Sequence, residues 1–178
     1  KCVDLRENGA DARTRELSID FYDGEIAYTD EQLGRLLAAL DQDGTLANTI
    51  VVLHSDHGEE LWDHGNVNHG HTQHEELLRV PLAIVSPGHV PATRVTTRVR
   101  ALDLFPTLAA LTGADVPTSI EGRDLAPVWR GVETADRDVV AEAVLHNPHE
   151  IQALLRQDEK LIVTRSQGAQ LFDLRVDP

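Results

Sequence analysis

Six of the nine histidines lie in one short stretch of the chain, between residues 54 and 74. Within it, Asp56, His57 and Gly58 come two residues after the apolar run at 50–53 ends. Carboxylates and neutral imidazoles are common side-chain ligands of divalent metals, and ordinary packing does not require so many histidines. Because glycine permits a sharp turn, adjacent Asp and His side chains can converge on one ion there. The pattern predicts a metal or anion site at Asp56 and His57.

Two further histidines, His69 and His71, flank Gly70 in a polar segment that follows the first cluster. An imidazole is readily protonated near neutral pH, so these rings can serve as proton donors or as contacts for an anion. The chain has a formal net charge of −14, so an anionic substrate would need a local positive centre. A metal together with protonated histidines would supply that centre.

The remaining polar residues of the stretch have weaker signals. Glu59 and Glu60 could ligate a metal, but a carboxylate pair is also favoured at a helix start by the helix dipole alone. We expect one of them to cap the next turn and the other to be solvated. Asp63 and His64 either shape the loop or join the site, and both readings stay open. The other histidines are expected to pack or to lie on the surface: His54 (satisfied within or behind the site), His74, His89, His146 and His149.

The elements that must position these residues are a helix and a strand. Apolar residues at helical spacing predict helix over 14–40, either one long helix or two abutting ones because of Gly24. Gly44 suits a left-handed C-terminal position. Residues 49–55 predict a strand buried on both faces. In open α/β sheets, ligands bind beyond the carboxyl ends of the strands, which is where Asp56 falls.

Downstream of residue 74 the pattern predicts further elements of both kinds. They are a second buried strand at 80–85, an edge strand at 94–100, a helix from an N-cap at Asp103 through 111 closed by Gly113, and a short helix at 125–129. Four β-prone runs follow at 138–145, 150–156, 160–164 and 170–174. Polar residues at 157–159 separate two of these runs. The tail therefore predicts a small antiparallel β meander.

Composition limits the classes of function. With 41% hydrophobic and 26% charged residues, the chain is typical of a globular protein rather than a disordered one. No basic stripe indicates nucleic-acid binding, and no apolar run approaches the roughly 18 residues of a membrane span. A single cysteine, Cys2, excludes an intrachain disulfide and a thiolate zinc cluster. No sequence feature points to an oligomeric state or a compartment.

Ten short motifs follow one another along the chain: YDGEI at 22–26, LGRLL at 33–37, NTIVV at 48–52, SDHGE at 55–59, DHG at 63–65, GHT at 70–72, EELLRVPL at 75–82, LDLFPTL at 102–108, EGRDL at 121–125 and LFDL at 171–174. This ordered series resembles the sulfatase branch of the alkaline phosphatase superfamily. The likeness covers nearly the whole chain. Each motif is weak by itself, and their order makes the resemblance specific.

The resemblance implies an alkaline phosphatase-like α/β fold with a mostly parallel central sheet flanked by helices. Residues 1–124 would form the C-terminal part of the catalytic domain, and 125–178 a small α+β subdomain carrying the antiparallel meander. Asp56 and His57 match two ligands of the single divalent cation, usually calcium in sulfatases, with zinc or manganese left open. His71, with His69 second, stands where many sulfatases carry a lysine that contacts the sulfate.

The implied activity is hydrolysis of a small sulfuric ester through a formylglycine made from a Cys/Ser-x-Pro-x-Arg motif. The segment CVDLR at 2–6 has Asp in place of the required Pro, so we expect the nucleophile to lie outside this chain. The chain then corresponds to the middle-to-C-terminal part of a sulfatase and is expected to be inactive alone. Two alternatives stay open. One is a two-zinc phosphodiesterase, phosphonate hydrolase or phosphoethanolamine transferase, with His69 or His71 on the second metal. The other is a non-catalytic truncated homologue.

Overall fold

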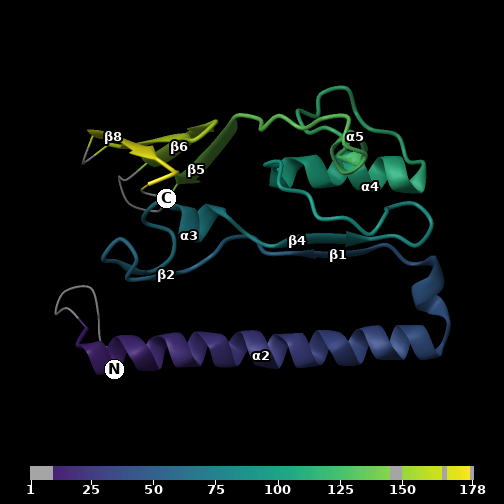
Figure 1. Ribbon diagram of the computed structural model, residues 1–178, viewed down its shortest axis with the longest axis horizontal. Coiled ribbons are helices and arrows are strands. Elements are labelled where there is room, and N and C mark those ends of the chain that lie inside the picture. Colours follow the sequence, from purple (N-terminus) through teal and green to yellow (C-terminus); the bar gives the residue numbers. More distant parts are fainter. Residues whose placement is uncertain (1–9, 145–149, 166–167, 177–178) are drawn as a thin grey trace. The chain divides into compact units, whose positions relative to one another are not determined.

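The computed structural model describes residues 10–144, 150–165 and 168–176, and the chain divides into two compact units, residues 1–84 and 85–178 (Figure 1). The elements up to this division are α2 (Ala12–Gln42), the 3₁₀ helix η1 (Thr45–Asn48), β1 (Val51–His54), β2 (Glu60–Leu61), β3 (Val67–Asn68), α3 (Glu75–Leu78) and β4 (Leu82–Val85). The later elements are η2 (Ala101–Asp103), α4 (Leu104–Thr112), α5 (Ala126–Trp129), β5 (Val139–Val144), β6 (Glu150–Arg156), β7 (Glu159–Thr164) and β8 (Gly168–Asp173).

The N-terminal helical pattern forms one helix, α2, which settles the alternative that Gly24 had left open. Asp11 caps it, since its carboxylate accepts a hydrogen bond from the Thr14 backbone N–H at 2.7 Å. The helix ends before Gly44, which has the expected positive φ of 80°. None of the residues of α2, all of which are described, is buried. No helix in the described part of the chain is both long and apolar enough to cross a membrane.

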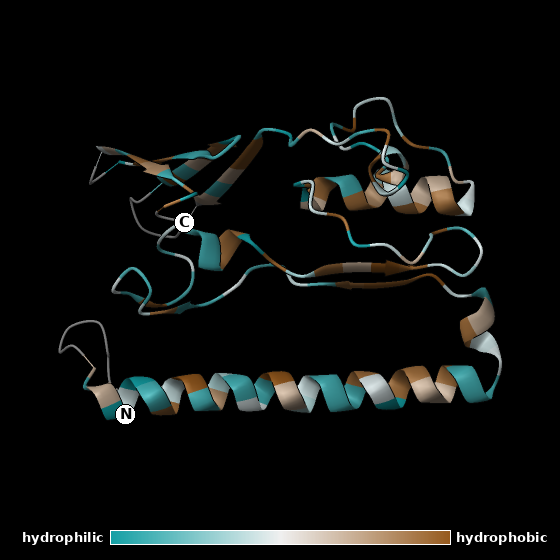
Figure 2. Ribbon diagram, in the orientation of Figure 1, coloured by the Kyte–Doolittle hydropathy of each residue, from teal (hydrophilic) through white to brown (hydrophobic). Residues whose placement is uncertain are grey.

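The strand that leads to Asp56 is β1, and it pairs with β4 in a two-stranded sheet. Figure 1 draws the two strands running in opposite directions, and Figure 2 shows both as mainly hydrophobic. Burial on both faces was expected but is not found, since Leu53 is 46% exposed and Val51 and Val52 are half-buried. The reason is that β4 is the one strand paired with β1 among the described residues. The mostly parallel sheet therefore stays a prediction.

The polar stretch after β1 contains a small hairpin that the sequence did not predict. Strands β2 and β3 are antiparallel, with Glu60 opposite Asn68 and Leu61 opposite Val67. Gly65, with φ of 84°, lies in the connecting turn, and its N–H donates to the Trp62 carbonyl at 3.1 Å. Two-residue strands are too short to show a period-two hydrophobic pattern, so they could not be predicted from the sequence.

The predicted edge strand at 94–100 is wrong, because this segment has no ladder partner in the described structure. Its polar side chains and backbone instead bond to loops. The Arg98 N–H donates to the Asp136 carboxylate at 2.7 Å, and the Arg98 guanidinium donates to the Gln157 carbonyl at 2.9 Å. The polar residues that alternate with apolar ones here hold neighbouring loops in place. The same alternation is typical of an edge strand, so the sequence pattern cannot distinguish the two.

Helix α4 is confirmed, and it ends at Gly113, whose φ is 74°. Asp103 is the N-cap residue of α4, as predicted, but its side chain makes no cap hydrogen bond to the helix. Its Oδ1 instead accepts from the Arg123 backbone N–H at 2.9 Å and from the Arg100 guanidinium at 3.2 Å. The predicted short helix at 125–129 is present as α5.

The C-terminal antiparallel meander is also confirmed, with strands in the order β5-β6-β7-β8. Its core-facing side chains alternate along the strands as the period of two requires. The buried apolar side chains of the sheet are Ile151, Ala153, Leu155 and Ile162. The turn between β6 and β7 contains Gln157, whose φ is 52°.

Two further predictions are not tested by this structure. His146 and His149 lie outside the described residues. The domain division at 124/125 stays a prediction.

Candidate functional site

The chain turns at the end of β1 so that Asp56 and His57 face each other. The Asp56 Oδ2 and His57 Nε2 atoms are 3.7 Å apart, and the side chains are 87% and 44% exposed. His57 Nδ1 lies 2.8 Å from the Gly58 carbonyl oxygen. Because a carbonyl can only accept, Nδ1 carries the hydrogen, so Nε2 is the ring nitrogen that could bind a metal. This tautomer and the adjacent carboxylate fit two ligands of a divalent metal.

Gly58 is needed because another segment approaches its backbone closely. Its N–H donates to the Leu77 carbonyl at 2.9 Å, and a Cβ at this position would overlap the carbonyl oxygen of Glu76. The first turn of α3 thus packs directly onto the loop that carries Asp56 and His57. The sequence predicted that Gly58 permits a turn. In the structure this glycine is required because the backbone of α3 packs closely against it.

The imidazoles downstream pair with carboxylates. His69 Nδ1 lies 3.1 Å from Glu59 Oε2, and His71 Nε2 lies 3.1 Å from Glu60 Oε2. The expectation that one glutamate caps a turn and the other is solvated is therefore wrong. The Glu60 side chain is completely buried and that of Glu59 is 20% exposed. The reason is that the β2–β3 hairpin folds the His-rich segment back over these residues.

The structure brings His69, but not His71, to the predicted metal ligands. The His57 and His69 rings have centroids 4.1 Å apart, whereas no contact in the described residues joins His71 to His57. Among the described residues, no three or more His, Cys, Asp and Glu side chains are grouped so that they could hold a metal ion. Asp56 and His57 therefore offer part of a coordination shell within this chain.

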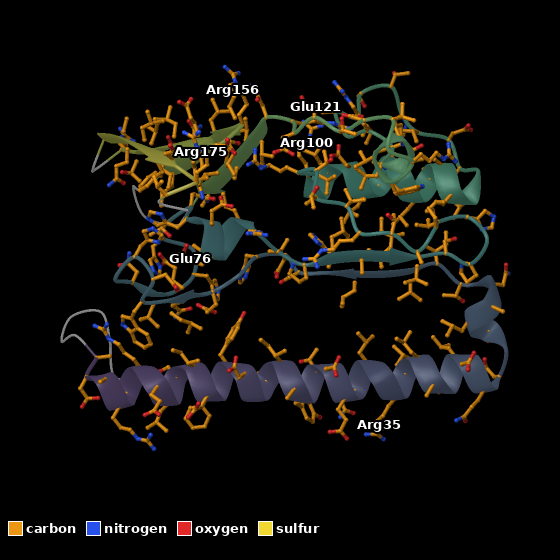
Figure 3. The ribbon with its side chains drawn as sticks, viewed as in Figure 1. Arg35, Glu76, Arg100, Glu121, Arg156 and Arg175 are labelled. Carbon is orange, nitrogen blue, oxygen red and sulfur yellow. The ribbon has the colours of Figure 1, made fainter. Side chains whose placement is uncertain are left out.

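A further histidine–glutamate pair connects the loop after β2 to helix α3. His64 Nδ1 lies 2.8 Å from Glu76 Oε1, and the His64 ring stacks on that of His74 at 3.7 Å (Figure 3 labels Glu76 at α3). His64 thus shapes the loop, which was one of its two open readings. The expected satisfied role of His54 is wrong, because its buried Nδ1 has no hydrogen-bond partner in the described part of the chain.

Glu60 is the wrongly predicted residue with the most buried side chain of the site. Its Oε1 accepts from the Thr72 hydroxyl at 2.8 Å. Burial raises the pKa of Glu60, and the Thr72 hydrogen bond and the His71 charge only partly oppose this. The available signal was the apolar pair Leu61-Trp62 directly after it, which indicates that the chain enters the interior there.

Comparison with known proteins gives this geometry a context. The family model described as Sulfatase matches residues 6–114, which is more than half of the chain. The chain belongs to the sulfatase family. Proteins of this family generally bind a divalent cation.

Individual relatives agree with the family assignment. Arylsulfatase K of Bos taurus is 31% identical over 170 residues, covering 89% of this chain and 31% of the relative. A crystal structure of a putative sulfatase from Bacteroides thetaiotaomicron is 26% identical with a TM-score of 0.82, covering 94% of this chain and 38% of that one. A phosphonate monoester hydrolase of Agrobacterium radiobacter is 27% identical with a TM-score of 0.77, covering 88% and 35%.

These similarities establish the fold class as alkaline phosphatase-like. The chain spans about a third of the length of the relatives that it matches. The described residues therefore correspond to one part of a sulfatase fold that carries the Asp56-His57 turn.

Proposed function

We propose that this chain forms the part of a sulfatase active site that holds two ligands of a divalent cation and the proton donor, and that the protein containing it hydrolyses sulfate esters. The observation that carries the proposal is the turn after β1, where Asp56 and His57 lie 3.7 Å apart in a chain of the sulfatase family. The small substrate would be an aryl or other sulfate ester.

Calcium is the cation that we propose, bound by the Asp56 carboxylate and His57 Nε2 together with ligands from outside this chain. Carboxylate oxygen suits calcium, while an imidazole ligand is more common for zinc or manganese, which are the alternatives. When bound, a divalent cation polarises the sulfate and offsets its negative charge. The Gly58 carbonyl accepts the Nδ1 hydrogen of His57 and so fixes the ring orientation in which Nε2 is free to bind.

His71 and His69 are proposed as the groups that contact the sulfate and protonate the leaving oxygen. Each ring has one nitrogen 3.1 Å from a glutamate carboxylate, which leaves the other nitrogen for the substrate. His71 is the first choice because its carboxylate partner is completely buried. The nucleophile, a formylglycine, is proposed to come from residues that this chain does not contain.

We also propose that β1 and β4 belong to a larger, mostly parallel sheet flanked by helices. Exposed apolar side chains on β1 and α2 support this, since Leu53 is 46% and Phe21 74% exposed. Residues 1–124 would complete the catalytic α/β domain, and 125–178 would form the small C-terminal subdomain. A crystal structure of the product of the complete coding sequence tests both statements.

A two-metal phosphonate or phosphodiester hydrolase is the second candidate. His69 and Glu59 favour it, because the His69 ring lies 4.1 Å from that of His57 and its Nδ1 lies 3.1 Å from Glu59 Oε2. The similarity to the Agrobacterium phosphonate monoester hydrolase points the same way. Metal analysis separates the candidates: two zinc ions per chain support this candidate, and one calcium ion supports the sulfatase.

The experiment that tests the proposed function measures turnover of p-nitrophenyl sulfate by the product of the complete coding sequence. We expect Asp56→Asn and His57→Ala to lower kcat/KM by at least about 10²-fold, because each removes a metal ligand. Thermal unfolding should change little, since both side chains are exposed. Asp158→Asn is the control. Sulfate turnover that survives Asp56→Asn, or hydrolysis of phosphonate esters alone, would contradict the sulfatase proposal. The 178-residue chain by itself should show no turnover.

A further inference from the structure

The Glu60–His71 pair has two buried polar atoms that face only each other. Glu60 Oε2 and His71 Nε2 are 3.1 Å apart, and neither has an aligned hydrogen-bond partner among the described residues. The other Glu60 oxygen is already used by the Thr72 hydroxyl, at 2.8 Å. A buried polar atom without a partner is unfavourable. The 3.1 Å separation is within hydrogen-bonding distance for an Nε2–H donor and a carboxylate oxygen.

The local backbone explains why this pair forms. Glu60 begins β2 and lies opposite Asn68 in the hairpin register. Asn68 and Gly70 have φ values of 81° and 88°, conformations that turn the chain sharply after β3. This turn returns His71 and Thr72 to the strand that carries Glu60. The adjacent residues His71 and Thr72 thus each contact one oxygen of the Glu60 carboxylate.

We propose that Glu60 is a positioning residue for the proposed proton donor His71: its buried carboxylate, held by Thr72, binds His71 Nε2–H and leaves Nδ1 as the nitrogen that serves the substrate. This inference rests on the proposed function for its catalytic consequence, though the contact itself does not depend on that function. The His71 side chain is 25% exposed, so part of the ring remains accessible while its Nε2 atom is buried.

The neighbouring pair, Glu59 and His69, provides an internal contrast. There the ring nitrogen near the carboxylate is Nδ1, and the side chains are 20% and 45% exposed. In the Glu60 pair the nitrogen is Nε2, and the exposures are 0% and 25%. Adjacent glutamates thus hold two histidines by opposite ring nitrogens, and only the Glu60 pair combines complete burial of the carboxylate with a second anchor, Thr72.

The charges around Glu60 come from three segments. His71 favours the ionised carboxylate, Glu76 on α3 opposes it, and His64 again favours it. Since Glu76 is itself bonded to His64, its negative charge is partly offset. Among these neighbours, His71 is the group that lies within 3.1 Å of the free Glu60 oxygen, so the pair is defined by geometry.

The positioning role can be tested by NMR of the protein labelled with ¹⁵N in its histidine rings. His71→Gln identifies the His71 signals by their loss. We expect the His71 Nε2–H proton to be protected from solvent exchange in the wild type, and the double change Glu60→Leu with Thr72→Val to abolish that protection. The double change preserves most of the volume and leaves no orphaned hydroxyl. Glu60→Gln, a milder variant, should speed exchange about tenfold.

The matched control is Glu59→Gln, which removes the carboxylate next to His69 and should leave the His71 ring proton protected. If His71 shows no protected Nε2–H in the wild type, or keeps it after either change at Glu60, the proposal is overturned. Loss of protection after Glu59→Gln would equally overturn it, because the effect would then not be specific to Glu60.

A second arm measures kcat for p-nitrophenyl sulfate in the product of the complete coding sequence. His71→Gln and the Glu60→Leu/Thr72→Val variant should each lower kcat about 10²-fold with little change in KM. Combining them should lower kcat no more than about twofold beyond His71→Gln alone, since Glu60 acts through His71. Glu142→Gln, whose carboxylate only accepts from Gln152 in the C-terminal sheet, is the activity control. Independent, multiplying losses would overturn the positioning role. Absence of wild-type sulfate turnover would overturn the proposed function alone, because the exchange experiment does not use it.

Discussion

Glu60 and Asp103 are both completely buried, one in each compact unit, yet their pKa values are displaced in opposite directions. Burial raises the pKa of Glu60, whose partners are a hydroxyl and an imidazole. Burial also acts to raise the pKa of Asp103. Hydrogen bonds from the Arg100 side chain and from the backbone N–H groups of Arg123 and Arg100, with the Arg100 charge, outweigh it, so the net pKa is lowered.

The difference lies in the donors. Guanidinium groups and backbone N–H groups keep their hydrogens at any ordinary pH, so Asp103 stays ionised and acts as a structural anchor. Asp103 joins Arg100, the 121–123 segment and Arg137, whose Nη1 atom lies 3.3 Å from Oδ1 (Figure 3 labels Arg100 and Glu121). Glu60 has a hydroxyl and an imidazole as its partners and no guanidinium, so burial outweighs them and its pKa is raised.

The largest effect is expected when the Asp103 anchor is removed. Asp103→Ala removes the buried counter-charge of Arg100, one of the two carboxylates beside Arg137 and the acceptor of two backbone N–H groups. It should lower the free energy of unfolding by about 3–5 kcal/mol. Urea denaturation measures this change. Asp138→Ala is the matched control: its carboxylate lies 2.6 Å from Arg156, but the side chains are 47% and 63% exposed. Its loss should be no more than about 1 kcal/mol. Equal losses of unfolding free energy for Asp103→Ala and Asp138→Ala would show that burial does not make Asp103 a stronger anchor.

A smaller loss of stability is expected when alanine replaces Gly58, two residues before Glu60, or Gly122, which precedes the Arg123 N–H that bonds to Asp103. A Cβ at Gly58 would overlap the Glu76 carbonyl oxygen, and one at Gly122 would overlap that of Leu102. Both obstacles are backbone atoms, so each Gly→Ala change should cost about 1–3 kcal/mol of stability. Gly24→Ala in α2 meets no atom within 4 Å and should instead stabilise the helix by about 0.5–1 kcal/mol. Measuring melting temperatures of the three variants checks the signs.

The pH dependence of stability should have opposite signs for the two carboxylates. A lowered pKa means that the Asp103 contribution is complete above the unfolded pKa, about 3.9, and is lost as the pH falls through the folded pKa. A raised pKa means that the Glu60 contribution is complete below about 4.3 and is lost as the pH rises through the folded pKa. Each slope is at most about 1.4 kcal/mol per pH unit.

These slopes can be read separately because Trp62 belongs to the first unit and Trp129 to the second, and the chain has two tryptophans. Unfolding is followed by fluorescence in Trp62→Phe and Trp129→Phe backgrounds. Relative to Asp103→Asn, the parent protein should lose stability as the pH falls. Relative to Glu60→Gln, it should lose stability as the pH rises. Slopes of the same sign would show that burial, not the donors, dominates at both sites.

The sequence by itself determined the elements with strong local signals. The helix that became α2, the strand leading to Asp56, α4 with its closing Gly113, and the C-terminal meander all follow from periodicity and turn residues. It also indicated the family, through motifs whose order survives along the chain. The same local signals misled at 94–100, where alternating residues anchor loops through Arg98 instead of forming a strand.

Only the tertiary structure decided which carboxylates are buried and what they bind. Glu59 and Glu60 are chemically identical neighbours, yet one is partly exposed against His69 and the other is completely buried against His71 and Thr72. That difference arises from a two-residue hairpin and from backbone turns at Asn68 and Gly70. Residue type and spacing specify which atoms can accept or donate a proton. Burial and the choice of partner depend on contacts between distant segments, so they are fixed only when the chain folds.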